Sequence, residues 1–142
     1  MSVEELTKKV EEFKSEGNKH FQKSNLQEAI LAYSKGLEAC KDGTIDPNLN
    51  ATILSNRAAC YLNSGLLQKS VDDCTEALKV VKDDTIRCKI LYRRAKAWFL
   101  LTETTKSMRA MLNDAAKDLL QLLSIDRNND HAGALLKAIR AK

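Results

Sequence analysis

One four-residue pattern recurs along the chain with the same internal spacing. Its later members follow the first residue by 12, 16 and 19 positions. The two copies are Gly17, Ala29, Tyr33 and Gly36, and then Ala58, Ser70, Cys74 and Ala77. Small residues at the first, second and fourth places allow two helices to approach closely, while the third side chain fills the gap between them. The pattern therefore predicts helical hairpins that repeat along the chain.

A third copy begins at Ala95, where Trp98 follows three residues later, as Tyr61 follows Ala58. Its second half starts at Ala115, which is 20 residues after Ala95 rather than 12. We therefore expect an eight-residue insertion in the third hairpin, within residues 101–114. The insertion either lengthens both helices of that hairpin or forms an exposed arm.

Apolar residues recur every three or four positions, as expected of helices that bury one face. Val3, Leu6, Val10 and Phe13 form one such run. The chain has 142 residues, of which 44% are hydrophobic, and it contains one proline and five glycines. Helix breakers are therefore scarce, and there is enough apolar material for one core. We predict a single all-α domain over residues 1–142.

Turn-forming residues indicate where the helices begin and end. Asn25 is followed three residues later by Glu28, which is a capping-box pattern and predicts a helix from about Leu26. Residues 42–48 and 63–65 have the composition of a loop and of a tight turn. Asp114 and Asp130 are further candidates for helix starts.

In these repeats the chain resembles the tetratricopeptide-repeat (TPR) proteins, whose unit is a helical hairpin of about 34 residues. The resemblance implies three hairpins, at about residues 10–43, 51–84 and 88–129, stacked as a right-handed superhelix. A capping helix over about 130–142 is expected to follow, since Ala132, Leu135 and Ile139 share one face and polar residues lie opposite.

Five residues at matched places in the three hairpins resemble the dicarboxylate clamp of a co-chaperone class. They occur in the strings Lys14-Ser-Glu-Gly-Asn18, Ser55-Asn56-Arg57-Ala58-Ala59 and Lys89-Ile-Leu-Tyr-Arg93-Arg94-Ala95. Similar strings occur in the Hsp-organising protein, the TPR-containing phosphatase, the myosin-chaperone co-chaperones and the mitochondrial-precursor adaptors. The resemblance implies that Lys14, Asn18, Asn56, Lys89 and Arg93 line a concave groove. It also implies binding to the Glu-Glu-Val-Asp C-terminus of seventy- and ninety-kilodalton heat-shock chaperones.

The chemistry of these side chains suits such a ligand. A C-terminal aspartate offers two carboxylates, to which two lysines and one arginine supply charge-assisted donors. The two asparagine amides both donate and accept, which orients the ligand. Phe21, Leu62 and Phe99 either form apolar pockets beside this site or belong to the ordinary core. Lys96 either extends the positive field or is solvated, and Tyr92 is either groove floor or packing.

Other chemical motifs do not stand out from the sequence. His20 and His131 have no partners at metal or triad spacing, and the four cysteines form no Cys-x-x-Cys pair. We read the cysteines as buried residues of a protein in a reducing compartment. We therefore predict no enzyme activity, no metal, no cofactor and a cytoplasmic location.

The expected partner is a chaperone tail, and the domain is expected to be a monomer. The net charge of +4 is too modest for a nucleic-acid coat, and no segment is long enough to insert into a membrane. Two alternatives remain: a scaffold that binds another folded protein through its convex face or enlarged third hairpin, and a surface for acidic lipid or RNA. We expect Asp72, Asp73 and Asp118, on the second helices, to belong to the solvated outer face.

Overall fold

The computed structural model describes residues 1–102 and 108–141 of the chain. In this part every regular element is an α-helix, so the predicted all-α class is confirmed. The helices are α1 (Val3–Gln22), α2 (Leu26–Ala39), α3 (Pro47–Asn63), α4 (Leu67–Val80), α5 (Asp84–Leu101), α6 (Met108–Ile125) and α7 (Asp130–Arg140). No helix in the described ranges is both long and apolar enough to cross a membrane.

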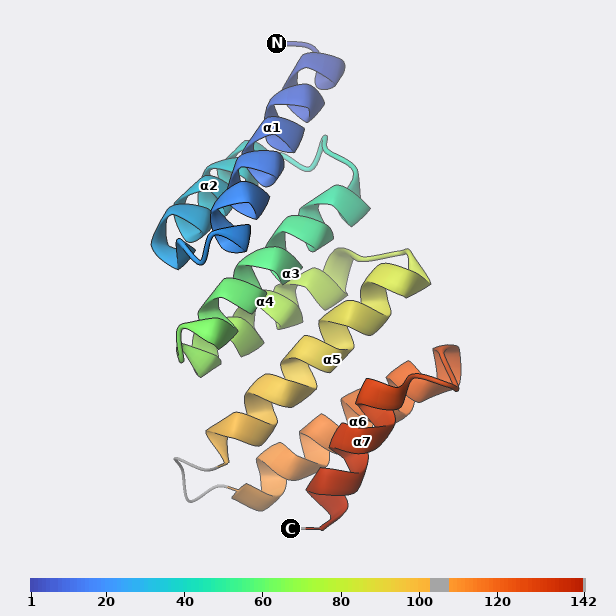
Figure 1. Cartoon of the computed structure of the whole chain (residues 1–142). Helices are drawn as coiled ribbons and strands as arrows, with labels where there is room; N and C mark the ends of the chain where they lie inside the picture. Colours follow the sequence, from blue (N-terminus) through green and yellow to red (C-terminus); the bar gives the residue numbers. More distant parts are fainter. Residues whose placement is uncertain (103–107, 142) are drawn as a thin grey trace.

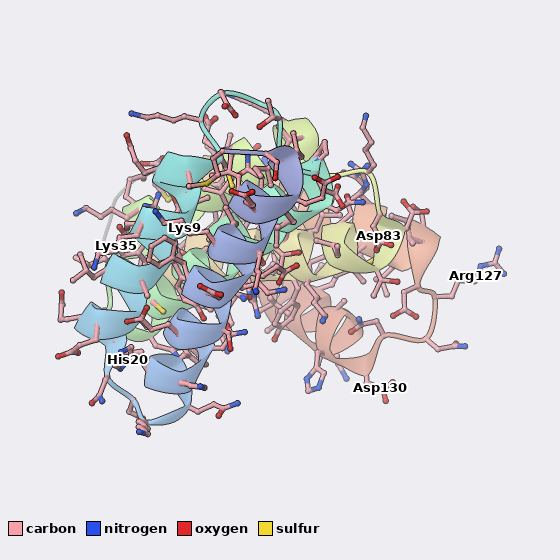
Figure 2. All side chains as sticks on the ribbon, turned by 90° about the horizontal axis from the view of Figure 1, so that it is seen from above. Lys9, His20, Lys35, Asp83, Arg127 and Asp130 are labelled. Atoms are coloured by element: carbon pink, nitrogen blue, oxygen red, sulfur yellow. The ribbon has the colours of Figure 1, made fainter. Side chains whose placement is uncertain are left out.

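Consecutive helices pair into hairpins, α1 with α2, α3 with α4 and α5 with α6, and each hairpin packs against the next. The first helices of the hairpins lie on the near side in Figure 1, with their partners behind them and α7 beside α6. The two termini lie at opposite ends of the stack. Seen from above in Figure 2, His20 and Lys35 of the first hairpin lie on one side, and Arg127 and Asp130 lie far from them on the other.

The close approach that the repeat pattern predicts occurs between α1 and α2. A Cβ atom added to Gly17 would lie 2.4 Å from Cε1 of Tyr33, which leaves no room for any side chain larger than hydrogen. The Tyr33 side chain fills that gap and is only 1% exposed. Ala58 and Ala95 occupy the equivalent first positions of the next two hairpins and are fully buried. The small residues therefore mark the contacts within the hairpins.

The turn residues locate most helix boundaries correctly, but the predicted capping box at Asn25 is wrong. Helix α2 does begin at Leu26, yet the Asn25 side chain makes no capping hydrogen bond. The turn is closed by the backbone instead, since the Asn25 N–H donates to the carbonyl oxygen of His20 at 2.9 Å. Gly65 and Leu66 repeat this arrangement in the next hairpin, where the Leu66 N–H donates to Tyr61 O at 2.9 Å.

Asp114 lies inside α6, so the prediction that it starts a helix is wrong. Helix α6 has 18 residues, whereas α2 and α4 have 14 each. Part of the predicted insertion therefore lengthens this helix ahead of Asp114. Residues 103–107, which belong to the same predicted insertion, lie outside the described residues.

Ser24 offers a direct test of these turns, because it occupies a left-handed conformation with φ of 61°. Gly65, at the equivalent place in the second hairpin, has φ of 79°. A side chain is strained in this region and glycine is not, so Ser24→Gly is expected to raise the free energy of unfolding by about 0.5–1 kcal/mol. Urea denaturation measures this change. Gly65→Ser is the matched control and should lower stability by a similar amount; stabilisation by both changes would contradict the turn geometry.

Two buried ion pairs each join the two helices of one hairpin, which corrects the expectation for two of the three outer-face aspartates. Asp73 and Asp118 are only 6% and 4% exposed. Each accepts two hydrogen bonds of 2.8 Å from an arginine on the first helix of its own hairpin, Arg57 and Arg94 respectively. The Asp72 side chain is exposed, as expected.

Each of these arginines also reaches back to the preceding hairpin. Arg57 Nη1 donates to Ser34 Oγ of α2 at 3.0 Å, and Arg94 Nη1 donates to Thr75 Oγ1 of α4 at 3.1 Å. The arginine planes also lie against aromatic rings, with Arg94 Cζ 4.7 Å from the centre of the Trp98 ring. The same polar joint is therefore built twice, and it fixes how one hairpin sits on the next.

Candidate functional site

The first helices of the hairpins and the α6–α7 connection enclose a hollow of about 660 Å³. Its lining includes Phe21 of α1, Leu62 of α3, and Lys89, Tyr92, Arg93 and Lys96 of α5. All six were candidate site residues from the sequence. The other four candidates, Lys14, Asn18, Asn56 and Phe99, are not among the lining residues of this hollow. Phe99 packs against the hydrophobic cluster of the third hairpin.

Arg93 is held at the wall of the hollow by the neighbouring helix α3. Its Nη1 donates to the Ser55 carbonyl oxygen at 2.9 Å and to Ser55 Oγ at 2.6 Å. Burial lowers the pKa of Arg93, but a guanidinium remains charged at neutral pH. The bonds that the structure records use one of its terminal nitrogens, so the guanidinium has a fixed plane and keeps further N–H groups for a ligand.

Asn18 and Asn56, on α1 and α3, are joined directly. Asn56 Nδ2 donates to Asn18 Oδ1 at 3.2 Å. The buried Tyr33 hydroxyl donates to the same oxygen at 2.5 Å. Asn56 follows Ser55 in the chain, and Ser55 accepts from Arg93 of α5. Helix α5 therefore packs against the part of α3 that carries Asn56. The two amides and the guanidinium thus lie on three neighbouring helices, α1, α3 and α5.

The lysines are less constrained than these groups. Lys89 lines the hollow and is exposed, as is Lys96. Lys14 is half-buried, is not among the lining residues of the hollow, and pairs with Glu11 on its own helix, with 3.0 Å between Nζ and Oε2. It lies one turn before Asn18 on α1, so the sequence prediction for Lys14 depends on that pair opening.

One end of the hollow is lined by acidic, apolar and histidine side chains that were not predicted from the sequence. Asp84 at the start of α5 also lines the hollow, as do Ile125, Asp126 and His131 around the α6–α7 connection. The His131 ring meets the Tyr92 ring edge-on, with 6.3 Å between the ring centres. Because these residues belong to connections and helix starts, no repeat position identifies them.

The described residues contain no group of three or more His, Cys, Asp or Glu side chains able to hold a metal ion. The four cysteines are buried and free, and burial raises the pKa of Cys60 to about 11 and of Cys74 to about 12. These two thiols are therefore neutral at ordinary pH.

Comparison with known proteins gives the same picture as the geometry. No protein-family model matches the sequence. The chain is 34% identical over 118 residues to protein unc-45 homolog B of Danio rerio, covering 83% of this chain and 11% of that protein. It is 33% identical over 132 residues to the Hsp70/Hsp90 co-chaperone CNS1 of Saccharomyces cerevisiae, covering 87% of this chain and 32% of that protein. The chain therefore spans less than a third of the length of these relatives.

The fold is also shared with a solved complex. The first TPR of Spaghetti (RPAP3), bound to the HSP90 peptide SRMEEVD, superposes with a TM-score of 0.77 at 28% identity. The match covers 95% of this chain and 93% of that one. Fold, repeat spacing and sequence similarity agree, and the resemblance found in the sequence is confirmed: the chain is a tetratricopeptide-repeat domain, close in sequence and structure to the TPR domains of Hsp70/Hsp90 co-chaperones.

Proposed function

We propose that this domain is a co-chaperone adaptor that binds the C-terminal Glu-Glu-Val-Asp tail of seventy- or ninety-kilodalton heat-shock chaperones. The observation that carries the proposal is the hollow lined by Lys89 and Arg93 of α5, beside the neighbouring helices α1 and α3 that carry the linked amides of Asn18 and Asn56. Two similar proteins support it, since one is named as an Hsp70/Hsp90 co-chaperone and the other was solved with an HSP90 peptide ending in Glu-Glu-Val-Asp.

The ligand's terminal aspartate supplies two carboxylates, and the site supplies cations and amide donors for both. Arg93 and Lys89 lie one helical turn apart on α5 and line the same hollow, so both reach the same ligand. Charge-assisted hydrogen bonds of this kind are about twice as strong as neutral ones. Lys14 joins them by exchanging its bond to Glu11, an exposed acid, for a ligand carboxylate.

Residues upstream of the ligand's end are accommodated by the remainder of the hollow. Phe21, Leu62 and Tyr92 offer apolar surface there, and we assign the side chains that precede the terminal aspartate to it. An acyl chain or an internal peptide segment lacks the pair of carboxylates and would leave the cations of the site unpaired.

The acid end is tested by titrating a labelled peptide, Ser-Arg-Met-Glu-Glu-Val-Asp, against its C-terminally amidated twin by fluorescence anisotropy. The acid-ended peptide is expected to bind with a Kd of about 1 μM, because a short flexible tail is ordered on docking. The amidated peptide is expected to bind about 30-fold more weakly, since one charge-assisted contact is lost. Affinity should also fall as salt is raised.

A scrambled peptide with a free acid end is the control for general charge attraction. It keeps the net charge of the tail and loses the order of its side chains. Equal affinity for the acid and amidated tails would refute recognition of the chain end. Equal affinity for the scrambled peptide would indicate the alternative of charge-driven surface binding.

We also propose that the protein is cytoplasmic. The four buried free cysteines fit a reducing compartment.

A further inference from the structure

We propose that Tyr33 is a positioning residue that makes the groove select an ionised carboxylate over a carboxamide, because its hydroxyl fixes which face of the Asn18 amide points into the groove. The inference rests on the proposed function, since it concerns the same ligand. Tyr33 itself does not contact the ligand.

Two donors converge on the side-chain oxygen of Asn18. The Tyr33 hydroxyl donates to Asn18 Oδ1, and Asn56 Nδ2 donates to the same atom at 3.2 Å. An amide oxygen has two lone pairs, so both are used. The Asn18 group that remains for a ligand is therefore its Nδ2, which carries two N–H donors and no acceptor.

The opposite orientation of the Asn18 amide would lose both of these hydrogen bonds. With the amide turned over, its NH₂ group would face the Asn56 NH₂ group, donor against donor. The Tyr33 hydroxyl hydrogen would also lose its acceptor, and Asn18 is the hydrogen-bond partner that the structure records for it. A buried donor without an acceptor costs roughly 1–3 kcal/mol, so the amide is held one way round.

Tyr33 holds this orientation because it cannot move or ionise. Its ring is 1% exposed and fits against Gly17, where there is no space for a Cβ atom. Burial raises the pKa of Tyr33 to about 12, so the hydroxyl keeps its proton at any ordinary pH. The hydroxyl therefore acts as a permanent donor to Asn18.

A fixed donor face separates ligands by their chemistry. A carboxylate only accepts, so it is complementary to Asn18 Nδ2 and to the Arg93 guanidinium. A carboxamide offers N–H groups as well, and these meet donors. Without the Tyr33 hydroxyl, Asn18 and Asn56 can turn over together and present an oxygen that accepts from the carboxamide. The ratio of the affinity for the acid to the affinity for the carboxamide should then fall.

The test compares wild type with Tyr33→Phe, which removes the hydroxyl and keeps the ring. Three peptides are titrated: Ser-Arg-Met-Glu-Glu-Val-Asp, its C-terminal carboxamide, and the version whose last residue is asparagine with a free acid end. In wild type both carboxamide peptides bind more weakly than the parent. In Tyr33→Phe the affinity ratio of parent to carboxamide is expected to fall by about fivefold in at least one of the two comparisons, the loss expected for one neutral hydrogen bond.

Tyr61→Phe is the matched control, because Tyr61 is a half-buried tyrosine on α3 for whose hydroxyl the structure records no hydrogen bond. Its ratios should equal those of wild type. A general loosening of the fold would weaken all three peptides equally and leave the ratios unchanged. If wild type prefers the acid and both ratios survive in Tyr33→Phe, the positioning role is refuted while the proposed function stands. If wild type shows no preference, the proposed function itself fails.

A second measurement on the wild-type protein does not depend on the variant. The side-chain NH₂ group of Asn18 gives its own pair of signals in a ¹H–¹⁵N NMR spectrum, assigned by their loss in Asn18→Asp. Binding of the acid-ended peptide should shift both signals, because the NH₂ group faces the ligand. Signals that stay in place on saturation with this peptide would overturn the inference.

Discussion

Replacing Asp118 with alanine is expected to lower the free energy of unfolding by about 3 kcal/mol, since breaking one partner of a buried ion pair leaves the other charge uncompensated. The Arg94 and Asp118 side chains are 18% and 6% exposed, and both carboxylate oxygens accept from the guanidinium at 2.8 Å. Urea denaturation followed by circular dichroism gives the change in stability. Hydrogen exchange should show α5, α6 and α7 losing protection first, because Arg94 also bonds to Thr75 of the preceding hairpin.

Asp72→Ala is the matched control for that loss. Asp72 lies on α4 beside Asp73, is exposed, and accepts one hydrogen bond from Gln68 of its own helix at 3.0 Å. Its replacement should change stability by less than about 0.5 kcal/mol. A similarly small change for Asp118→Ala would mean that the buried Arg94–Asp118 pair contributes little to stability. The inference that this pair helps fix the third hairpin on the second would then be wrong.

The repeat pattern predicted the hairpins because it consists of contacts that allow few residue types. Gly17 faces the Tyr33 ring at a distance that excludes a Cβ atom, so its identity follows from the packing. Ala58 and Ala95 are fully buried at the same place in their hairpins. Residues selected by close packing recur at fixed spacing, and spacing is visible in a sequence.

The polar joints were missed because an aspartate's burial depends on the neighbouring helix and not on its own. Asp72 and Asp73 are adjacent in sequence, yet one is exposed and the other is 6% exposed. A signal was available: Arg57 and Arg94 each precede the first small residue of a hairpin, and Asp73 and Asp118 each precede its third position, Cys74 and Leu119. The first hairpin has Glu16 and Ala32 at these places, so the pattern has two copies and was read as surface charge.

The residues that would contact a ligand were easier to predict than the residues that hold them. Asn18, Asn56, Lys89 and Arg93 were predicted from their types at matched places, and the structure puts them on adjoining helices. The roles of Tyr33 and Ser55 depend on hydrogen bonds across 15 and 38 residues of sequence. Tyr33 also fits the packing pattern of the repeat. Its presence in the sequence therefore does not indicate that its hydroxyl bonds to Asn18.

Arg93→Ala is expected to weaken binding of the acid-ended peptide by about 100-fold, because it removes a charge-assisted donor with a fixed plane. Arg93→Lys should recover little of this loss. A lysine has one compact ammonium group and cannot both bond to Ser55, as Arg93 Nη1 does at 2.6 Å, and present a planar pair of donors to the ligand. Fluorescence anisotropy with the same peptide measures both variants, and circular dichroism confirms that each remains helical.

Lys96→Ala distinguishes this specific contact from a general positive field. Lys96 lines the same hollow from the same helix, less than one turn after Arg93, and is exposed. Exposed charges interact weakly in water, so the loss of affinity should be about threefold or less, and it should vanish at high salt. The Arg93→Ala deficit should persist at high salt, because that side chain is partly buried and screened less. Equal, salt-sensitive losses for the two variants would mean that net charge alone attracts the ligand, and a fixed carboxylate site would no longer be needed to explain binding.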